Sequence, residues 1–285
     1  MGKIYSDKII VTGAPRSGTS MMSLLMTYFK DLSVYENGTP PTLWDNHNIF
    51  TTQFRPDGKI WNDFIPKPTG LVDFLKDGVK VIVIYRDGRD CVVSKRIPKT
   101  DYWYTGTEGI NKWVTSAKEL ISAMDDVKGK SYKNNLLVIK YEDFCKHPKK
   151  HMNKIEKFVG YELDKSWEKF HLDYKDVKSM STEGAIGTEH SSLRPIKPNS
   201  GRWKKTEYTA RIKEVIDNYG KDFKELLISL GYEKDSKWVD EYIKPITFVI
   251  PSRNNLDLLK IAYKSIRALS GKHEILILDD ASVDG

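Results

Sequence analysis

The sequence contains few of the residues that build disulfide frameworks, membrane spans or fibrous proteins. Only two of its 285 residues are cysteine, too few for a disulfide framework or a four-ligand zinc site. The longest apolar runs, VIVIY and ILIL, are far shorter than the ~20 residues that a membrane-spanning helix needs, and the first residues lack the apolar stretch of a signal peptide. Ordinary glycine, proline and apolar contents exclude collagen, long coiled coils and wholesale disorder. We therefore expect a globular chain in a reducing cytoplasm.

The chain also lacks a strong charge of either sign. Its 46 basic and 39 acidic residues leave a formal net charge of +7. This small excess fits an anionic ligand, but the basic residues are not interleaved with aromatic residues on one element, as a nucleic-acid-binding surface would require. We therefore expect no nucleic-acid partner. At about 150 residues per domain, the length predicts one large domain or one and a half.

Patterns of buried strands and amphipathic helices alternate along most of the chain. Apolar runs typical of strands in a parallel sheet occupy residues 8–12, 79–85 and 136–141. Apolar residues at helical spacing occupy residues 19–32, 107–127, 152–159 and 206–230. This alternation predicts an α/β fold, a P-loop-like three-layer sandwich with a central parallel sheet. Residues 36–70 and 173–205 show no sustained period, so we expect long loops there, the first of them lid-like.

The segment VTGAPRSGTSMM joins the first expected strand to the first expected helix. Gly13 and Gly18 stand five residues apart, as in a P-loop, so successive backbone N–H groups can converge on a phosphate or sulfate at the helix N-terminus. Where nucleotide triphosphatases carry a lysine after the second glycine, this chain has Thr19, and the basic residue of the loop is Arg16. The segment indicates a phosphate cradle without the ATPase lysine; the alternative is a glycine-rich turn with an exposed arginine.

The segment YRDGRDCVVSKR directly follows the second expected strand. We expect Arg86 at the carboxyl end of that strand, where ligands of open α/β sheets gather, and Ser94 on the second turn of the next helix. An arginine and a hydroxyl in this place suit a phosphate monoester. The alternative is that Asp87 and Asp90 cap the helix while Arg86 and Arg89 pair with surface acids.

These segments together resemble the sulfotransferase superfamily, whose donor is 3′-phosphoadenosine 5′-phosphosulfate (PAPS). PRSGTS is similar to the family's 5′-phosphosulfate loop, and RDGRDCVVS is similar to its 3′-phosphate motif, with Gly88 where proline is commoner. KYEDFCKHP at residues 140–148 and SGRWKK at residues 200–205 resemble two later family segments in the same order. The resemblance runs from about residue 8 to residue 230.

The resemblance implies a PAPS-dependent sulfotransferase that moves a sulfonate group to a hydroxyl acceptor and needs no metal. The residues that would hold the 5′-phosphosulfate are Arg16, Ser17, Gly18, Thr19 and Ser20. In this reading Arg16 also has a catalytic role, because its charge would neutralise the leaving phosphate as the S–O bond breaks.

The resemblance also implies a site for the 3′-phosphate of the donor. The residues that would bind it are Arg86, Ser94, Gly201 and Arg202. For the neighbouring Trp203, packing and contact with the adenine remain open alternatives.

An acceptor hydroxyl must lose its proton as it attacks sulfur, so the resemblance requires a nearby base. Glu36 is the first candidate, because protein-tyrosine and some carbohydrate sulfotransferases carry a catalytic glutamate just past the first helix. His47 is the alternative, because the cytosolic branch uses a histidine. His147 and His151 stand four residues apart on an expected helix, but without a third ligand we expect a solvated face rather than zinc.

Residues 245–285 resemble the opening of an inverting, family 2-like nucleotide-sugar glycosyltransferase, through VIPSRN and DDASVDG. In an intact domain of that family Asp280 would contact the nucleotide. Arg253 departs from the usual aromatic residue and Ala281 from the usual glycine. The acidic metal-binding motif that follows in the family is absent from these residues, so we expect no glycosyl transfer by them. We therefore expect a sulfotransferase-like domain at 1–240 and an incomplete glycosyltransferase-like fragment at 245–285, a pairing that favours a sugar or glycan acceptor.

Two other functions stay open at the level of the sequence. A small-molecule kinase of the P-loop type is disfavoured by the missing lysine after Gly18. A non-catalytic module that binds a nucleotide or a glycan beside a glycosyltransferase is the alternative from another class. Tyr102, Trp103 and Tyr104 are candidates for an acceptor pocket, with ordinary surface packing as the alternative.

Overall fold

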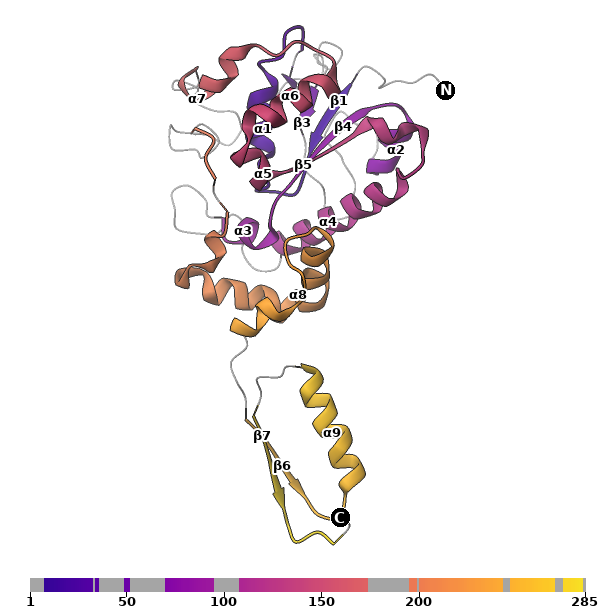
Figure 1. Ribbon diagram of the computed structural model, residues 1–285, viewed down its shortest axis with the longest axis vertical. Coiled ribbons are helices and arrows are strands. Elements are labelled where there is room, and N and C mark those ends of the chain that lie inside the picture. Colours follow the sequence, from indigo (N-terminus) through magenta and orange to yellow (C-terminus); the bar gives the residue numbers. More distant parts are fainter. Residues whose placement is uncertain are drawn as a thin grey trace. The chain divides into compact units, whose positions relative to one another are not determined.

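A computed structural model describes residues 8–32, 34–35, 49–51, 70–94, 108–173, 195–198, 200–242, 247–269 and 274–283. The contacts divide the chain into two compact units, Met1–Tyr232 and Glu233–Gly285, each of which is described by itself (Figure 1). Within the described part of the chain, no helix is both long enough and apolar enough to cross a membrane.

The first unit is built on a five-stranded sheet whose strands all pair in parallel, in the order β2-β3-β1-β4-β5. The strands are β1 (Ile9–Thr12), β2 (Val34–Tyr35), β3 (Ile49–Thr51), β4 (Lys80–Tyr85) and β5 (Leu136–Lys140). In the central strand β1, Ile10 lies opposite Phe50 of β3 on one side and Val81 of β4 on the other. Strands β1 and β4 are almost wholly buried, as expected of a parallel sheet that is covered on both faces.

One face of the sheet is covered by three helices, α1 (Thr19–Met26), α5 (Tyr141–Lys146) and α6 (Pro148–Val159) (Figure 1). The side chains that fill the space between these helices and the sheet include the fully buried Met22, Leu25, Ile84, Phe144 and Ile155. Each such side chain contributes about 1.5–3 kcal/mol to folding through its removal from water. This layer fixes the place where β1 passes into α1.

The other face is covered by helix α4 (Glu108–Asp126), and α8 (Thr209–Ser229) packs on α4. Trp113 of α4 meets Phe223 of α8 edge to face, with ring centroids 4.9 Å apart. The short helices α2 (Leu71–Lys76) and α3 (Gly88–Val92) also contact α4. The structure thus has helices on both sides of a parallel sheet, and the predicted α/β sandwich is confirmed. The remaining short helices of this unit are η2 (Ser131–Asn135), η3 (Lys165–Lys169), α7 (Phe170–Asp173), η5 (Arg202–Lys204) and η6 (Thr206–Tyr208).

The structure corrects the expected elements in two places. Strand β3 lies inside residues 36–70, where we expected only a loop. Three residues are too few to show the alternation of a strand in the sequence, and β3 forms because it pairs with β2 on one side and β1 on the other. Helix α1 ends at Met26 rather than near residue 32, because the chain turns there and Phe29 forms an antiparallel bridge with Leu163. Both differences arise from pairing between segments distant in sequence.

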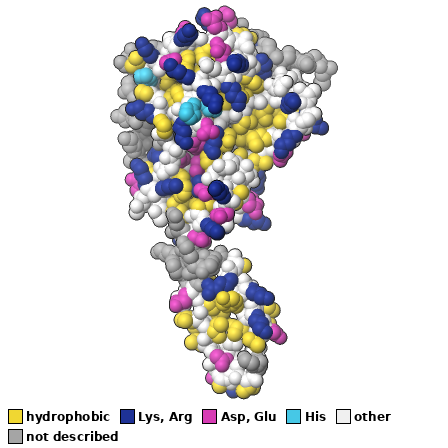
Figure 2. All heavy atoms as spheres, in the orientation of Figure 1, with side chains coloured by type: hydrophobic (Ala, Val, Ile, Leu, Met, Phe, Trp, Pro, Cys, Tyr) yellow, Lys and Arg dark blue, Asp and Glu magenta, His cyan; other side chains and the backbone are white. Residues whose placement is uncertain are grey.

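The second unit contains η7 (Lys237–Glu241), β6 (Thr247–Ser252), α9 (Leu256–Leu269) and β7 (Glu274–Asp279). Strands β6 and β7 pair in parallel along their whole length. Hydrophobic side chains lie at the surface of this unit (Figure 2), and Val249, Leu258, Ile261 and Leu278 are each more than half exposed. One helix and two strands cannot cover both faces of a parallel pair, which explains this exposure.

Candidate functional site

The loop between β1 and α1 is shaped by two close approaches of its backbone to other elements. A Cβ atom at Gly13 would lie 2.1 Å from the carbonyl oxygen of Ile84, so the loop passes directly against the end of β4. Gly18 has a φ of +106°, and a Cβ atom there would lie 2.7 Å from the ring of Tyr141. Only glycine fits either position, and Gly18 then leads into the first turn of α1.

The loop has the properties of an anion cradle. It ends at the N-terminus of the eight-residue helix α1, where backbone N–H groups carry partial positive charge. Ser17 is fully buried, and its Oγ has no hydrogen-bond partner among the described residues; the same is true of Thr12 Oγ1 at the end of β1. Thr19 is buried as well, whereas Ser20 is exposed. An unsatisfied buried hydroxyl beside a helix N-terminus suits a phosphate or sulfate oxygen.

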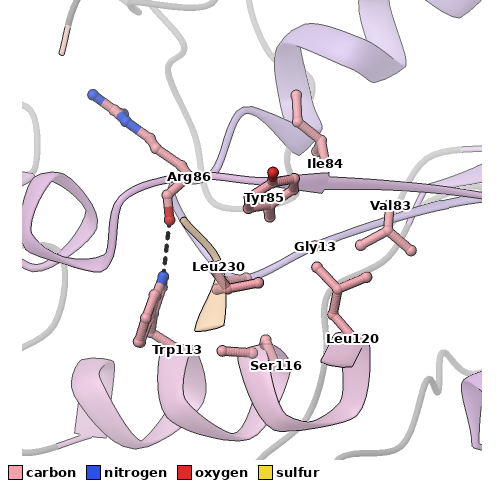
Figure 3. Close-up of a pocket in the computed structure, with 11 residues that line it drawn as sticks. Gly13, Val83, Ile84, Tyr85, Arg86, Trp113, Ser116, Leu120 and Leu230 are labelled. Carbon is pink, nitrogen blue, oxygen red and sulfur yellow. Dashed lines mark hydrogen bonds between the residues drawn. The ribbon is translucent and has the colours of Figure 1, made fainter. Parts of the chain in front are cut away.

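Arg86 lies where β4 ends, as expected from the sequence. Its side chain is buried, its Nη1 donates to the carbonyl oxygen of Arg16 at 3.2 Å, and its guanidinium lies 4.4 Å from the ring centroid of Tyr141. Trp113 Nε1 donates to the Arg86 carbonyl oxygen at 3.0 Å, as the dashed line in Figure 3 shows. Behind this bond lies a cavity of about 10 Å³, room for one water molecule, so it is not a ligand pocket.

Arg16 and Ser94 connect the two segments that the sequence singled out. Arg16 has a φ of +68°, and its Nε donates a 2.8 Å hydrogen bond to Ser94 Oγ. The prediction for Ser94 is wrong in one respect: α3 has a single turn that ends at Val92, and Ser94 lies just after it rather than on a second turn. The tertiary structure therefore brings Arg16, Arg86 and Ser94 together, although 78 residues separate the first from the last.

Helix α3 begins with a buried ion pair. Asp87 is its N-cap and accepts from the backbone N–H of Arg89 at 2.9 Å. The Arg89 guanidinium donates to both carboxylate oxygens of Asp87, at 2.8 to 3.2 Å. The capping alternative is thus right for Asp87, but neither Arg86 nor Arg89 is a surface residue, since both are at most 6% exposed.

A third segment, which begins at Gly201, lies against α3. The N–H groups of Gly201 and Trp203 donate to the two oxygens of Asp90, at 2.8 and 3.1 Å. The buried Trp203 ring lies 3.9 Å from the Arg89 guanidinium carbon, so it packs on α3. Arg202 is half-buried, and its Nη2 donates to Tyr208 Oη at 3.2 Å. Of the sequence-predicted residues, Gly201 and Arg202 thereby belong to a turn next to α3, the helix that follows Arg86 and leads to Ser94.

Two residues of the site received no role from the sequence. Glu142, at the start of α5, accepts from the backbone N–H of Asp87 and from the hydroxyl of Tyr232, both at 3.0 Å. Burial raises the pKa of Glu142, and it also raises the pKa of Tyr232. Glu142 lies in KYEDFCKHP, a segment that resembles the family but whose resemblance assigns this residue no role. Tyr232 carried no signal, because it belongs to no motif.

Burial also raises the pKa of Tyr141, to about 12, so the ring that touches Gly18 and Arg86 stays neutral. The candidate base Glu36, its alternative His47 and the aromatic residues 102–104 lie outside the described residues. Among the residues that are described, no group of three or more His, Cys, Asp and Glu is arranged to hold a metal.

Comparison with protein families identifies the first unit. The family model "Sulfotransferase domain" matches residues 6–231. The chain belongs to the sulfotransferase family. The resemblance to sulfotransferases at residues 8–230 is therefore confirmed, and the glycosyltransferase-like interpretation of residues 245–285 stays a prediction.

Similarity to individual sulfotransferases is distant. The chain is 23% identical over 224 residues to "Cytosolic sulfotransferase 17" of Arabidopsis thaliana, a match that spans 70% of this chain and 62% of that protein, less than two thirds of its length. Among solved structures, mouse sulfotransferase SULT7A1 complexed with PAP has a TM-score of 0.49 at 16% identity, with 80% of this chain and 90% of that chain covered. Retinol dehydratase in a complex with retinol and PAP has a TM-score of 0.42 at 16% identity, with 77% and 82% covered.

Proposed function

We propose that this protein transfers a sulfonate group from PAPS to a hydroxyl group of an acceptor. Family membership supports this assignment, and one structural observation carries it: the β1–α1 loop and the β4–α3 segment meet through hydrogen bonds from Arg16 to Ser94 and from Arg86 to Arg16. Two cationic side chains and a hydroxyl thus converge beside a loop that suits an anion. A donor with phosphates at both its 3′ and 5′ positions matches this arrangement.

The β1–α1 loop is proposed to hold the 5′-phosphosulfate through Arg16, Ser17, Gly18, Thr19 and Ser20. When bound, PAPS supplies the activated sulfonate. The backbone N–H groups of the loop and the orphan hydroxyl of Ser17 would bind the phosphosulfate oxygens, and the Arg16 guanidinium would offset the charge that develops on the phosphate side of the breaking bond. No described residue has to form a covalent intermediate for this role.

The 3′-phosphate is proposed to bind to Arg86, Ser94, Gly201 and Arg202. Arg86 offers a buried guanidinium held in place from two sides, which suits bidentate recognition of a phosphate. Ser94 now accepts from Arg16, and its hydroxyl can rotate to donate to a phosphate oxygen. The two phosphate positions would then share a hydrogen-bonded boundary between Arg16 and Ser94.

The acceptor side of the proposal rests on sequence. Glu36, or alternatively His47, would take the proton of the attacking hydroxyl.

We propose a carbohydrate acceptor, because residues 245–285 resemble the start of a glycosyltransferase domain. The two segments that carry this resemblance lie side by side, since hydrogen bonds run from Asn254 N to Ser282 Oγ and from Val283 N to Asn254 Oδ1. A cytoplasmic location is proposed from the same sequence features and from the cytosolic relative.

Calorimetric titration with 3′,5′-adenosine bisphosphate, AMP and ATP tests the donor site. We expect the wild type to prefer the bisphosphate over AMP by at least about tenfold, because the 3′-phosphate adds charge-assisted hydrogen bonds. Arg86→Ala should remove this preference. Arg267→Ala is a matched control, since Arg267 lies over the Tyr263 ring at 5.1 Å in the second unit, much as Arg86 lies over Tyr141.

Other outcomes would lead to other functions. If ATP binds best, a kinase becomes the better assignment. If the bisphosphate binds but labelled sulfonate passes from PAPS to no glycan, phenol or alcohol, the binding-module alternative gains support. Transfer to phenols alone would reject the carbohydrate acceptor and keep the sulfotransferase assignment.

A further inference from the structure

Asp90 uses its carboxylate in an unusual way for a residue inside a short helix. It is fully buried in α3, and its two oxygens accept from the backbone N–H groups of Gly201 and Trp203, which lie 111 and 113 residues further along the chain. A buried carboxylate is costly to desolvate, and burial raises the pKa of Asp90 accordingly. The two charge-assisted hydrogen bonds offset that cost, so the carboxylate acts as a clamp between α3 and the Gly201–Trp203 turn.

The neighbouring residue on α3 reinforces this clamp. Arg89 is held by Asp87 through three hydrogen bonds, and its guanidinium lies 3.9 Å from the Trp203 ring. The Gly201–Trp203 turn is therefore attached to α3 at its backbone by Asp90 and at its indole by Arg89. Both attachments originate from the segment that also carries Arg86.

The space beside the Cα of Gly201 is open. Gly201 has a φ of +76°, and a Cβ atom built there would meet no atom of the described residues within 4 Å. Gly201 adds no side-chain packing, so its attachment to α3 comes from the hydrogen bond that its N–H donates to Asp90, and Arg202 follows it directly in the chain. The negative charge of Asp90 would repel a phosphate, so a favourable effect of Asp90 on phosphate binding must act through the groups that it holds.

We propose that Asp90 is a positioning residue for the 3′-phosphate: it fixes the Gly201–Trp203 turn against α3 and thereby places Arg202 beside Arg86 and Ser94. This inference rests on the proposed 3′-phosphate site. It predicts that the preference for a 3′-phosphorylated nucleotide depends on a residue that does not touch the nucleotide.

The test compares Asp90→Asn with the wild type in titrations with 3′,5′-adenosine bisphosphate and AMP. An asparagine keeps one acceptor oxygen but turns an N–H₂ group toward the second backbone N–H, so one end of the turn is released. We expect the ratio of the AMP dissociation constant to the bisphosphate dissociation constant to fall about tenfold, while AMP affinity changes less than about twofold. Asp90→Glu retains both acceptors but moves them by one methylene group, so we expect a ratio below that of the wild type and above that of Asp90→Asn.

Glu119→Gln is the matched control. Glu119 of α4 accepts from the backbone N–H of Leu71 at 2.9 Å, so it is also a carboxylate that clamps a distant backbone group, but it lies outside the nucleotide site. We expect Glu119→Gln to lower the melting temperature and to leave the nucleotide ratio unchanged. Equal losses of AMP and bisphosphate affinity in Asp90→Asn would show a merely structural role and overturn the proposal, as would an unchanged ratio.

The outcomes separate this inference from the proposed function. If the wild type does not prefer the bisphosphate, the 3′-phosphate site itself fails. If the wild type prefers it and Asp90→Asn does too, only the role of Asp90 fails. Should Asp90→Asn not fold, Asp90→Glu decides: the lengthened side chain shifts the turn, so a reduced ratio in a folded variant supports the proposal and a wild-type ratio rejects it.

Discussion

The two halves of the candidate donor site are built in different ways. The β1–α1 loop is one continuous segment whose shape comes from its own backbone and from the close approaches of Gly13 and Gly18. The proposed 3′-phosphate half is assembled from Arg86 after β4, Ser94 after α3 and the Gly201–Trp203 turn, and buried acids join these parts. The first half should therefore fail when the backbone is altered, whereas the second should fail when a supporting side chain is removed.

The strongest test of this difference is Gly18→Ala. Alanine would have to adopt the left-handed φ of Gly18, and its Cβ atom would press on the Tyr141 ring. We therefore expect a loss of about 3 kcal/mol in the free energy of unfolding. Binding of AMP and of the bisphosphate should be lost together, because both need the loop.

Gly129→Ala is the control, because Gly129 has a φ of +72° and open space where the Cβ atom would lie. This variant isolates the backbone strain and should lower the free energy of unfolding by only about 1 kcal/mol. Chemical denaturation and titration of both variants measure these effects; selective loss of the bisphosphate in Gly18→Ala would contradict the comparison.

Glu142→Ala tests the proposed 3′-phosphate half of the site, where Glu142 is the second buried acid, besides Asp90, that holds the parts together. The change leaves the backbone N–H of Asp87 and the hydroxyl of Tyr232 without their acceptor, so we expect a loss of about 2 kcal/mol in stability. The bisphosphate should lose more affinity than AMP, because Asp87 begins the helix that follows Arg86. Glu156→Ala is the control, since Glu156 accepts from Leu163 N away from the site. A stability loss without a change in nucleotide preference would make Glu142 a structural residue only.

The smallest expected effect is a pH dependence of the nucleotide preference. Burial raises the pKa of Asp90, so this carboxyl takes up a proton at a higher pH than an exposed aspartate. Because its pKa is higher in the folded than in the unfolded chain, the folded state binds this proton more tightly, and the contribution of Asp90 to stability grows as the pH falls. The protonated carboxyl has lost an acceptor, however, and the preference for the bisphosphate should decline a few-fold.

Titrations from neutral pH down to the ordinary pKa of an aspartate, about 4, measure this decline. The ligand phosphates titrate in the same range, so Asp90→Asn serves as the reference. We expect a steeper fall of the ratio in the wild type than in the variant. Parallel pH profiles would show that the ligand alone titrates.

Much of the fold could be predicted because its signals are local. Strand β4 is apolar from Val81 to Ile84, as a strand buried on both faces must be, and α4 shows its apolar residues at helical spacing. Strand β3 could not be predicted, since three residues become a strand only when β1 and β2 pair with them. The second unit shows the same limit: the sequence predicts its strands and helix, but their burial depends on layers that the unit does not contain.

The candidate site shows the same difference between local signals and contacts across the chain. Sequence alone determined the glycine spacing, the cationic Arg16 and Arg86 and the order of the motifs, because a phosphate loop is made of neighbouring residues. Only the tertiary structure decided that Arg16 bonds to Ser94 and that Asp90 holds Gly201, because a side chain's partner across more than 70 residues is chosen by packing of the sheet and helices between them.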